Sequence, residues 1–190
     1  PAALAQLFTE ARTFSHWQNR EVADAPIEEA LATALLGPTS GNCEPLRVVL
    51  VKSPEGKARL LPCVSSGNSE KVRTAPVTAI VAYDTRFYEH LPRLFPHTDA
   101  RSWFTSNEAL ATETAFRNSS LQGAYFILAL RAAGLDCGPM SGFNNAAVDA
   151  EFFPDGRYRS NFLMNIGYGD RAALHPRPPR LALGEVARWA

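Results

Sequence analysis

One long apolar segment constrains the fold of this chain more than any other part of its sequence. Residues 105–108 (Thr-Ser-Asn-Glu) have the composition of a helix-capping box, and a mostly apolar sequence then continues to Gly134. At 1.5 Å per residue, the predicted helix is roughly 40 Å long. Many of its side chains are small, so we expect another surface to pack closely against it. These small residues are Ala115, Ser119, Ser120, Gly123 and Ala124.

Three shorter apolar segments predict buried strands. They span residues 46–51 (LRVVLV), 77–83 (VTAIVAY) and 162–168. Further helices are expected over residues 2–11, after a cap at Asp24, and after Ser53. Because strands neither alternate regularly with helices nor follow one another as hairpins, the pattern favours an α+β fold with a mainly antiparallel sheet flanked by helices.

The length of 190 residues fits a single domain, taken as residues 1–190. Within it, residues 84–105 show no clear period and contain several prolines and aromatic side chains. An irregular segment of this length is commonly a lid or a binding excursion. The tail from residue 175 is rich in proline, so we expect an extended segment before a short terminal helix.

Charge and cysteine content argue against several functional classes. Nineteen lysines and arginines balance 19 aspartates and glutamates, so we expect no nucleic-acid or membrane partner held by bulk electrostatics. A neutral surface also makes self-association unsurprising. Cys43, Cys63 and Cys137 form neither a CxxC pair nor a metal-ligand cluster, so no disulfide frame and no metal site are predicted. Without a recognisable signal peptide or membrane-spanning run, the cytoplasm is the expected compartment.

Two segments are rich in glycine, proline and short polar side chains. The first covers residues 37–45 (GPTSGNCEP) and the second covers residues 136–143 (DCGPMSGF). Bare backbone of this kind can approach a flat ligand, and Gly142 could direct its N–H toward a ring nitrogen. On composition alone, an ordinary connection or turn explains each segment equally well.

Polar and basic residues elsewhere add weaker signals. Asn68 and Lys71 are spaced i and i+3, which places both on one face of a helix. Together they could hold the polar edge of a heterocycle, although a solvated surface pair is the simpler interpretation. Arg12, Arg177 and Arg180 could bind phosphate oxygens, whereas arginines in a tail commonly face water.

Signatures of other chemistries are missing from the sequence. No GxGxxG follows a strand, and there is no GxSxG and no P-loop. The four histidines are dispersed, and none lies at metal-ligand spacing from a second ligand. Cys43 could be considered as a nucleophile of a hydrolase, but no partner histidine can be assigned to it.

Taken in order along the chain, these features resemble the nitroreductase family of FMN enzymes. Members of that family have an arginine in the first helix, a P-S/T-S-x-N-x-x-P loop, an N-x-x-K pair before a buried strand, a P-x-x-G-F loop after the long helix and a basic pair near the C-terminus. The matching residues are Arg12; Pro38, Thr39, Ser40, Asn42 and Pro45; Asn68 and Lys71; Pro139, Met140, Ser141, Gly142 and Phe143; and Arg177 and Arg180. The family's R-x-S-x-R/K start is replaced here by Arg12-Thr-Phe-Ser-His16, so only Arg12 is carried over from it.

The resemblance implies a homodimer with the long helix at its interface and two FMN sites, each touched by both chains. The three arginines would hold the phosphate, and Lys71 with Asn68 would meet the pyrimidine edge and stabilise negative charge on the reduced flavin. Gly142 would donate its N–H to flavin N5, and residues 38–42 of the partner chain would line the ring. No side chain is assigned as a catalytic acid or base, and no metal is expected.

The reaction that the resemblance implies is ping-pong: NAD(P)H, as co-substrate, passes hydride to flavin N5, and an acceptor then receives it. Segments such as GPTSGN, FPHTDARSWF and DCGPMSGF resemble the malonic semialdehyde reductase branch, which implies reduction of that aldehyde to 3-hydroxypropanoate. Arg101 and Phe104 in the irregular segment are the candidate substrate residues, with Arg101 as the anchor for the substrate carboxylate. The alternatives are a generic NAD(P)H quinone or nitroaromatic reductase and a non-redox flavin-binding relative.

Overall fold

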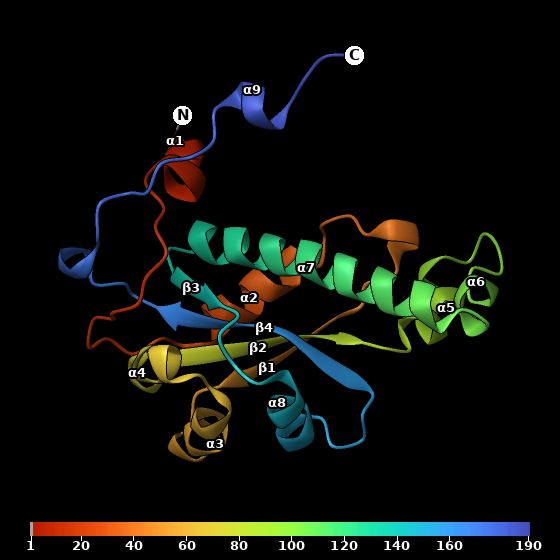
Figure 1. Cartoon of the computed structure of the whole chain (residues 1–190), viewed down its shortest axis with the longest axis horizontal. Helices are drawn as coiled ribbons and strands as arrows, with labels where there is room; N and C mark the ends of the chain where they lie inside the picture. Colours follow the sequence, from red (N-terminus) through yellow and green to blue (C-terminus); the bar gives the residue numbers. More distant parts are fainter. Residues whose placement is uncertain (1) are drawn as a thin grey trace.

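A four-stranded antiparallel sheet lies between two layers of helices in the computed structural model, which describes residues 2–190 (Figure 1). The strand order is β1-β2-β4-β3. The strands span Leu46–Val51 (β1), Val77–Asp84 (β2), Asp136–Met140 (β3) and Tyr158–Gly167 (β4). Every neighbouring pair is antiparallel, so the predicted α+β fold with an antiparallel sheet is confirmed.

The helices cover the sheet on both faces (Figure 1). The long helix α7 (Glu108–Ala132) and α2 (Asp24–Ala34) share one apolar cluster with the strands. Three shorter helices cover the other face and form a second cluster through Leu60, Val72 and Val148. They are α3 (Pro54–Leu60), α4 (Ser66–Thr74) and α8 (Asn145–Phe152).

The small side chains of α7 bring this helix close to its own sheet. Ala115, Ser119 and Gly123 are buried, and a Cβ atom at residue 123 would lie 2.7 Å from the ring of Phe162 on β4. For Ser119 and Gly123, the closely packed surface expected from the sequence is therefore the sheet of the same chain, whereas Ala115 packs against the 84–105 segment. The large exposed side chains of α7 are Leu110, Phe116 and Leu121.

Two helix starts differ in detail from the predictions. The cap of α7 is Asn107, whose side chain accepts a hydrogen bond from the Leu110 N–H at 3.0 Å. Asp24 was predicted to cap α2, and this is wrong, since residue 23 occupies the cap position. The Asp24 carboxylate instead accepts a hydrogen bond from Lys52 Nζ at 2.8 Å, because the charge of the lysine is a stronger partner.

The interpretation of residues 136–143 as a loop is wrong for its first part. Residues 136–140 form the edge strand β3, which pairs with β4 from Asp136↔Gly167 to Met140↔Leu163. Pro139 has no N–H to donate, which a strand tolerates at the edge of a sheet. Because glycine and proline are uncommon in strands, the sequence did not predict this one. Strand β4 also begins four residues earlier than predicted, at Tyr158, and α8 was not predicted.

Residues 84–105 are irregular, as expected, but they are well packed. They contain a 3₁₀ turn (Phe87–His90), α5 (Leu91–Leu94) and α6 (Ser102–Thr105), which enclose a third apolar cluster with Cys43 and the start of α7. At the root of the segment, the buried carboxylate of Asp84 accepts hydrogen bonds from Arg47 at 2.8 Å and from Arg157 at 3.0 Å. Burial alone would raise the pKa of Asp84, but these hydrogen bonds and charges lower it below 3.8.

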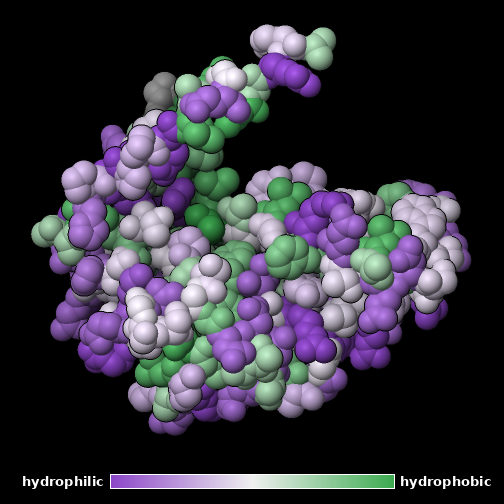
Figure 2. Space-filling view, viewed as in Figure 1, coloured by the Kyte–Doolittle hydropathy of each residue, from purple (hydrophilic) through white to green (hydrophobic). Residues whose placement is uncertain are grey.

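The N-terminal segment and the first part of the tail lie side by side on one side of the molecule (Figure 1), where Arg177 binds the carbonyls of Thr9 and Ala11. Helix α1 (Ala2–Leu4) continues into a π-helical turn (Ala5–Thr9), and the Gln6 side chain donates to carbonyls at the end of α7. The tail is extended up to α9 (Leu183–Val186), as predicted, and Figure 2 shows it projecting from the rest of the surface. Within residues 2–190, no helix combines the length and the apolar character that crossing a membrane requires.

Candidate functional site

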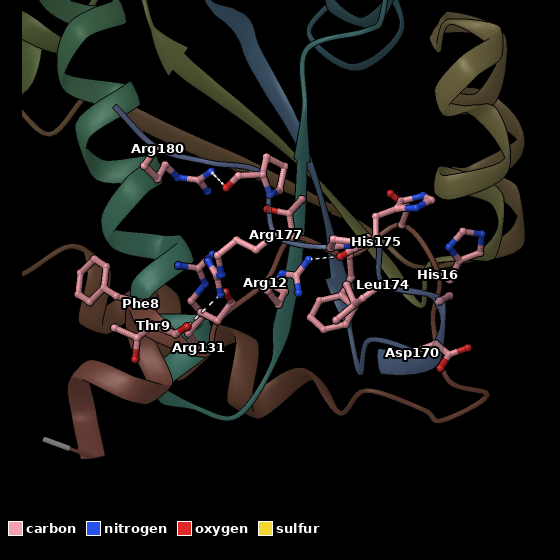
Figure 3. A pocket seen from close by; sticks show the side chains of 17 residues that line it. Phe8, Thr9, Arg12, His16, Arg131, Asp170, Leu174, His175, Arg177 and Arg180 are labelled. Carbon is pink, nitrogen blue, oxygen red and sulfur yellow. Dashed lines mark hydrogen bonds between the residues drawn. The ribbon is translucent and has the colours of Figure 1, made fainter. Parts of the chain in front are cut away.

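A cavity of about 650 Å³ lies between the N-terminal segment and the tail (Figure 3). The three arginines predicted to bind phosphate, Arg12, Arg177 and Arg180, all line it. Arg12 Nη2 donates to the His175 carbonyl at 2.5 Å, and Arg177 Nη2 donates to the Ala11 carbonyl at 2.8 Å. These two bonds hold the N-terminal segment and the tail against each other, so residues distant in sequence form one cationic wall.

Several lining residues were not singled out from the sequence. Arg131, from the last turn of α7, donates to the Leu7 carbonyl at 2.9 Å, and its Nε is buried without a partner among the described residues. A basic residue in the last turn of a helix is usually attributed to the helix dipole. The sequence therefore did not identify Arg131 as a candidate site residue. Thr13, Ser15 and His16, which departed from the family pattern, also line the cavity.

A second group of predicted residues is joined by hydrogen bonds. Lys71 Nζ donates to Asn68 Oδ1 at 3.0 Å, so the two residues share a face of α4, as their spacing predicts. Asn68 Nδ2 in turn donates to the Gly142 carbonyl at 3.1 Å. The structure therefore connects the Asn68–Lys71 pair to the loop that follows β3.

Gly142 is packed so closely that a larger residue would not fit. Its carbonyl also accepts hydrogen bonds from the Ser65 N–H at 3.1 Å and from the Ser65 hydroxyl at 2.5 Å. A Cβ atom at residue 142 would lie 2.4 Å from Asn68 Nδ2 and 2.7 Å from Ser65 Oγ. The Gly142 N–H has no acceptor among residues 2–190, so it is available to a ligand. Ser65 was missed, although the cap position before α4 would have pointed to it.

The other loop residues differ in exposure. Pro139 and Ser141 are exposed, whereas Met140 is half-buried and packs against the second apolar cluster. Only Pro139 and Ser141 can therefore offer much of their surface to a ligand beside Gly142.

The cavity and the Asn68–Lys71–Gly142 group lie at the same end of the sheet. Thr13 forms a bridge with Cys137 of β3, and α4 leads directly into the start of β2 at Val77. The pKa of Glu70 on α4 is lowered mainly by its hydrogen bonds with Arg73, and His16 of the cavity adds a smaller effect. His16 is thus close to α4.

Pro38, Thr39, Ser40 and Asn42 lie at the opposite end of the sheet. The loop that carries them leads into β1 at Leu46, which pairs with Tyr83 near the end of β2, whereas α4 precedes the start of β2. At about 3.3 Å per residue, the length of β2 separates the two places by about 25 Å. Within one chain, this loop and the Asn68–Lys71 pair cannot contact the same small ligand.

The 37–45 loop is held in an unusual conformation. Gly41, Asn42 and Glu44 have positive φ angles of 57°, 51° and 39°, which is uncommon for residues other than glycine. The Ser40 N–H donates to Asn118 Oδ1 of α7 at 2.8 Å, and Asn42 Nδ2 donates to the Leu94 carbonyl at 2.9 Å. Backbone strain of this kind clusters at functional sites.

The two predicted substrate residues have different surroundings. Phe104 is half-buried, with its ring centroid 4.9 Å from that of Phe87, so it supports the 84–105 segment from within. Arg101 is exposed at the start of α6 and could reach a ligand. Trp103, which was not predicted, is 49% exposed and borders Gly41. It places an aromatic surface where the 84–105 segment meets the 37–45 loop.

The cysteines are poorly suited to nucleophilic chemistry. Burial raises the pKa of Cys43 to about 11 and that of Cys137 to about 12, and it also raises the pKa of Cys63. At neutral pH these thiols are protonated, and a thiol in this form is a poor nucleophile. This argues against the hydrolase hypothesis based on Cys43.

Chemically, the arrangement suits a phosphorylated ligand with a flat heterocycle. Guanidinium groups match phosphate oxygens, while an ammonium, an amide and a free backbone N–H can hold the polar edge of a ring.

Comparisons with known proteins identify the family of the chain and match its fold. Residues 9–168 match the profile of the nitroreductase family. The chain is 59% identical, over 98% of its length and 96% of the relative, to a Burkholderia lata protein named "putative NADH dehydrogenase/NAD(P)H nitroreductase". The fold is similar to that of a "putative nitroreductase in complex with FMN" from Exiguobacterium sibiricum, with a TM-score of 0.88, 23% identity and coverage of 98% of this chain and 97% of that one. A nitroreductase family protein of Streptococcus pneumoniae gives a TM-score of 0.84 with 23% identity over 98% and 100% of the two chains.

Proposed function

This chain belongs to the nitroreductase family of enzymes, and we propose that it is an FMN-dependent oxidoreductase that takes hydride from NAD(P)H. The observation that carries the proposal is the convergence, at one end of the sheet, of an arginine-lined cavity with the Asn68–Lys71–Gly142 group. The name of the Burkholderia relative supports NAD(P)H as the donor, and the FMN complex of the Exiguobacterium protein supports the cofactor.

The residues present fit FMN. Arg12, Arg177 and Arg180 supply positive charge for its phosphate, and the N–H of Gly142, which has no acceptor among residues 2–190, suits a polar atom at the edge of a ring. Lys71 is half-buried and can stabilise negative charge on the pyrimidine edge. When bound, FMN supplies hydride transfer in two half-reactions, first from NAD(P)H and then to an acceptor.

The protein's own contribution is to bind, orient and tune. Asn68 holds the ammonium of Lys71 through its Oδ1 atom and the Gly142 carbonyl through its Nδ2 atom. The charge of Lys71 and the N–H of Gly142 are therefore fixed relative to each other before a ligand binds. Preorganised donors of this kind stabilise developing negative charge without reorganisation.

We also propose that two copies of the chain share each site. The separation of about 25 Å between the 37–45 loop and α4 supports this, because the loop matches the family motif for the ring yet cannot reach the ring bound by its own chain. The exposed Leu110, Phe116 and Leu121 of α7 and the exposed Leu183 and Trp189 of the tail offer apolar surface for association.

For the acceptor, the name of the relative favours a broad NAD(P)H reductase that acts on quinones and nitroaromatics. Flat, electron-poor molecules suit a site built around an exposed ring. Malonic semialdehyde, giving 3-hydroxypropanoate, is the second candidate, and the observation that favours it is the exposed guanidinium of Arg101 on the 84–105 segment. A non-redox flavin-binding protein would bind FMN without consuming NAD(P)H.

Reconstitution with FMN tests the proposal. Purified protein is titrated with FMN, and its flavin absorbance is followed under anaerobic conditions after addition of NADH or NADPH. We expect binding and bleaching of the flavin band. A protein that ignores FMN would refute the assignment, and one that binds FMN but is not bleached would support the non-redox alternative.

The acceptor is tested by steady-state oxidation of NAD(P)H with a quinone, a nitroaromatic compound and malonic semialdehyde side by side. A higher kcat/KM for the quinone and the nitroaromatic compound supports the broad reductase. A preference of at least ten-fold for malonic semialdehyde would instead establish the narrower reaction.

A further inference from the structure

We propose that a buried hydrogen-bond chain formed by Lys57, Thr78 and Asn165 positions the Asn68–Lys71 pair toward the bound cofactor. The inference rests on the proposed function, since it concerns the geometry of the same site. None of the three residues lines the arginine cavity, and all three lie beneath α4, on α3, β2 and β4. They are positioning residues, because they act through α4.

The chemistry of the groups fixes the direction of the chain. Lys57 Nζ donates to Thr78 Oγ1 at 2.7 Å, Thr78 Oγ1 donates to Asn165 Oδ1 at 2.7 Å, and Asn165 Nδ2 donates to the Lys71 carbonyl at 3.0 Å. An ammonium group has only donors, so the Thr78 hydroxyl must accept from Lys57 and give its one proton to Asn165. The amide of Asn165 is therefore oriented with its NH₂ group toward α4.

Lys57 is an unexpected residue in this place. It is only 9% exposed, Thr78 and Asn165 are fully buried, and no carboxylate pairs with Lys57 in the described part of the chain. Lysines are rarely buried in this way without a charged partner, and burial of the unpaired charge is unfavourable. A contribution to stability alone does not account for this lysine.

Helix α4 is tied at its start to Gly142 by hydrogen bonds from Ser65 and Asn68, and it has few other attachments to the protein. It buries one side chain, Val72, and the side chain of its cap residue makes no capping hydrogen bond. The carbonyls of the last turn of a helix have no partners within the helix. Here Lys57 Nζ binds the Val72 carbonyl at 2.8 Å, while Asn165 binds the Lys71 carbonyl, which also accepts from the Ala75 N–H at 3.2 Å. The hydrogen-bond chain thus anchors the turn of α4 that carries Lys71.

The anchored turn leads directly to the groups that face the ligand. With its backbone held by Asn165, Lys71 extends to Asn68, and Asn68 extends to the Gly142 carbonyl. Breaking the hydrogen-bond chain should let Lys71 move away from the pyrimidine edge of bound FMN. The reduced, negatively charged form of FMN should then lose more affinity than the oxidised form.

Two substitutions interrupt the hydrogen-bond chain at different residues. Thr78→Val preserves the branched shape and removes the hydroxyl, and Lys57→Met preserves the aliphatic stem and removes the charge. For each, we expect the Kd for oxidised FMN to rise about five-fold and the Kd for reduced FMN to rise about fifty-fold. The ten-fold difference corresponds to a midpoint potential lowered by about 30 mV. Thr114→Val, the same change at a buried threonine of α7, is the matched control and should leave the potential unchanged.

A double-mutant cycle shows whether the chain acts through Lys71. In a Lys71→Met background, Thr78→Val should change the potential by less than about a third of its effect in the wild type. A wild-type potential in both folded single variants, or an undiminished shift without Lys71, would overturn the inference.

Hydrogen exchange in the protein without FMN provides a test that does not depend on the cofactor. Amides of α4 should exchange about ten-fold faster in Thr78→Val than in the wild type and the Thr114→Val control, whereas unchanged exchange would contradict the anchoring role. If the wild type fails to bind FMN, the proposed function fails, and the exchange measurement still decides whether the chain holds α4.

Discussion

Ser65 and Gly142 are joined by two hydrogen bonds, since the N–H and the hydroxyl of Ser65 both donate to the Gly142 carbonyl, at 3.1 and 2.5 Å. This pairing draws the residue after β3 onto the start of α4. It also directs the Gly142 carbonyl into the protein and leaves the N–H of the same residue unpaired among residues 2–190. The loop is therefore fixed with one donor free.

Replacing Gly142 with alanine should strongly weaken FMN binding. The new Cβ atom would lie 2.4 Å from Asn68 Nδ2 and 2.7 Å from Ser65 Oγ, so the hydrogen-bonded side chains must move or the loop must shift, at a cost of about 1–3 kcal/mol. We expect the Kd for FMN, measured by quenching of flavin fluorescence, to rise about ten-fold or more. Gly67→Ala is the control, because a Cβ atom there meets nothing within 4 Å. Equal affinities of the two variants would contradict the assigned role of Gly142.

Arg180→Gln should weaken binding of FMN without affecting riboflavin, which lacks the phosphate. The Arg180 guanidinium lines the cavity, and within residues 2–190 its hydrogen bonds reach only the adjacent carbonyls of Pro178 and Pro179. The substitution should therefore leave the fold intact. We expect the Kd for FMN to rise about five- to ten-fold at low salt and less at high salt, because salt screens exposed charges.

The control for this experiment is Arg188→Gln, which removes an exposed arginine of the tail that does not line the cavity. Titration calorimetry with both ligands measures the effect. If Arg180→Gln weakened FMN and riboflavin binding equally, the arginine would not be a phosphate contact.

The sequence was most informative where one physical requirement dominates. Strand β2 is an almost fully buried apolar run because both faces of the sheet are covered there, and both β1 and β2 were predicted closely. The i, i+3 spacing correctly placed Asn68 and Lys71 together on α4. Strand β3 was missed because its pairing with β4 is a long-range contact that its Gly-Pro composition does not encode.

Other parts of the site depend on contacts between distant segments. The cavity exists because Arg12 binds the backbone of residue 175 and Arg177 binds that of residue 11, which no local pattern indicates. Lys57 looks like an ordinary surface lysine in a short helix, and its burial follows from the packing of α3 and α4 on the sheet. The separation of the 37–45 loop from α4 likewise appears only once the strand register is known.

Lys57 should give the stability of the protein a distinct pH dependence. Burial lowers its pKa from 10.5 to about 8, so between these values the unfolded chain binds the proton and the folded chain does not. Where the unfolded state holds more protons, the free energy of unfolding rises with pH. Relative to Lys57→Met, the wild type should therefore gain at most about 1.4 kcal/mol per pH unit above pH 8.

Urea denaturation of both proteins at several pH values from 7 to 10.5 measures this difference. Neighbouring groups are common to both proteins and cancel, including Cys63 and the Arg59–Glu151 ion pair that joins α3 to α8. If the difference in free energy of unfolding between the wild type and Lys57→Met did not change with pH, Lys57 would have an ordinary pKa in the folded state.

Arg101→Ala separates the two candidate acceptors. If the guanidinium anchors the carboxylate of malonic semialdehyde, its loss should raise the KM for that aldehyde about ten-fold, as expected for one charged hydrogen bond. The KM for a quinone without a carboxylate should change less than two-fold. Arg93→Ala, at another exposed position of the 84–105 segment, is the control. An unchanged KM for malonic semialdehyde in Arg101→Ala would remove the residue from the substrate site.

Mixing two inactive variants tests whether each site uses two chains. Lys71→Met impairs the α4 side, and Gly41→Val impairs the 37–45 loop, because a β-branched residue disfavours the φ of 57° found there. In a dimer of one chain of each kind, one shared site would contain both substitutions and the other would contain neither. Random exchange makes half of the dimers mixed, so about a quarter of the wild-type NADPH oxidation should return after co-refolding. If each site belonged to a single chain, the mixture would stay as inactive as its two components. The two variants refolded separately and then combined without exchange provide the baseline.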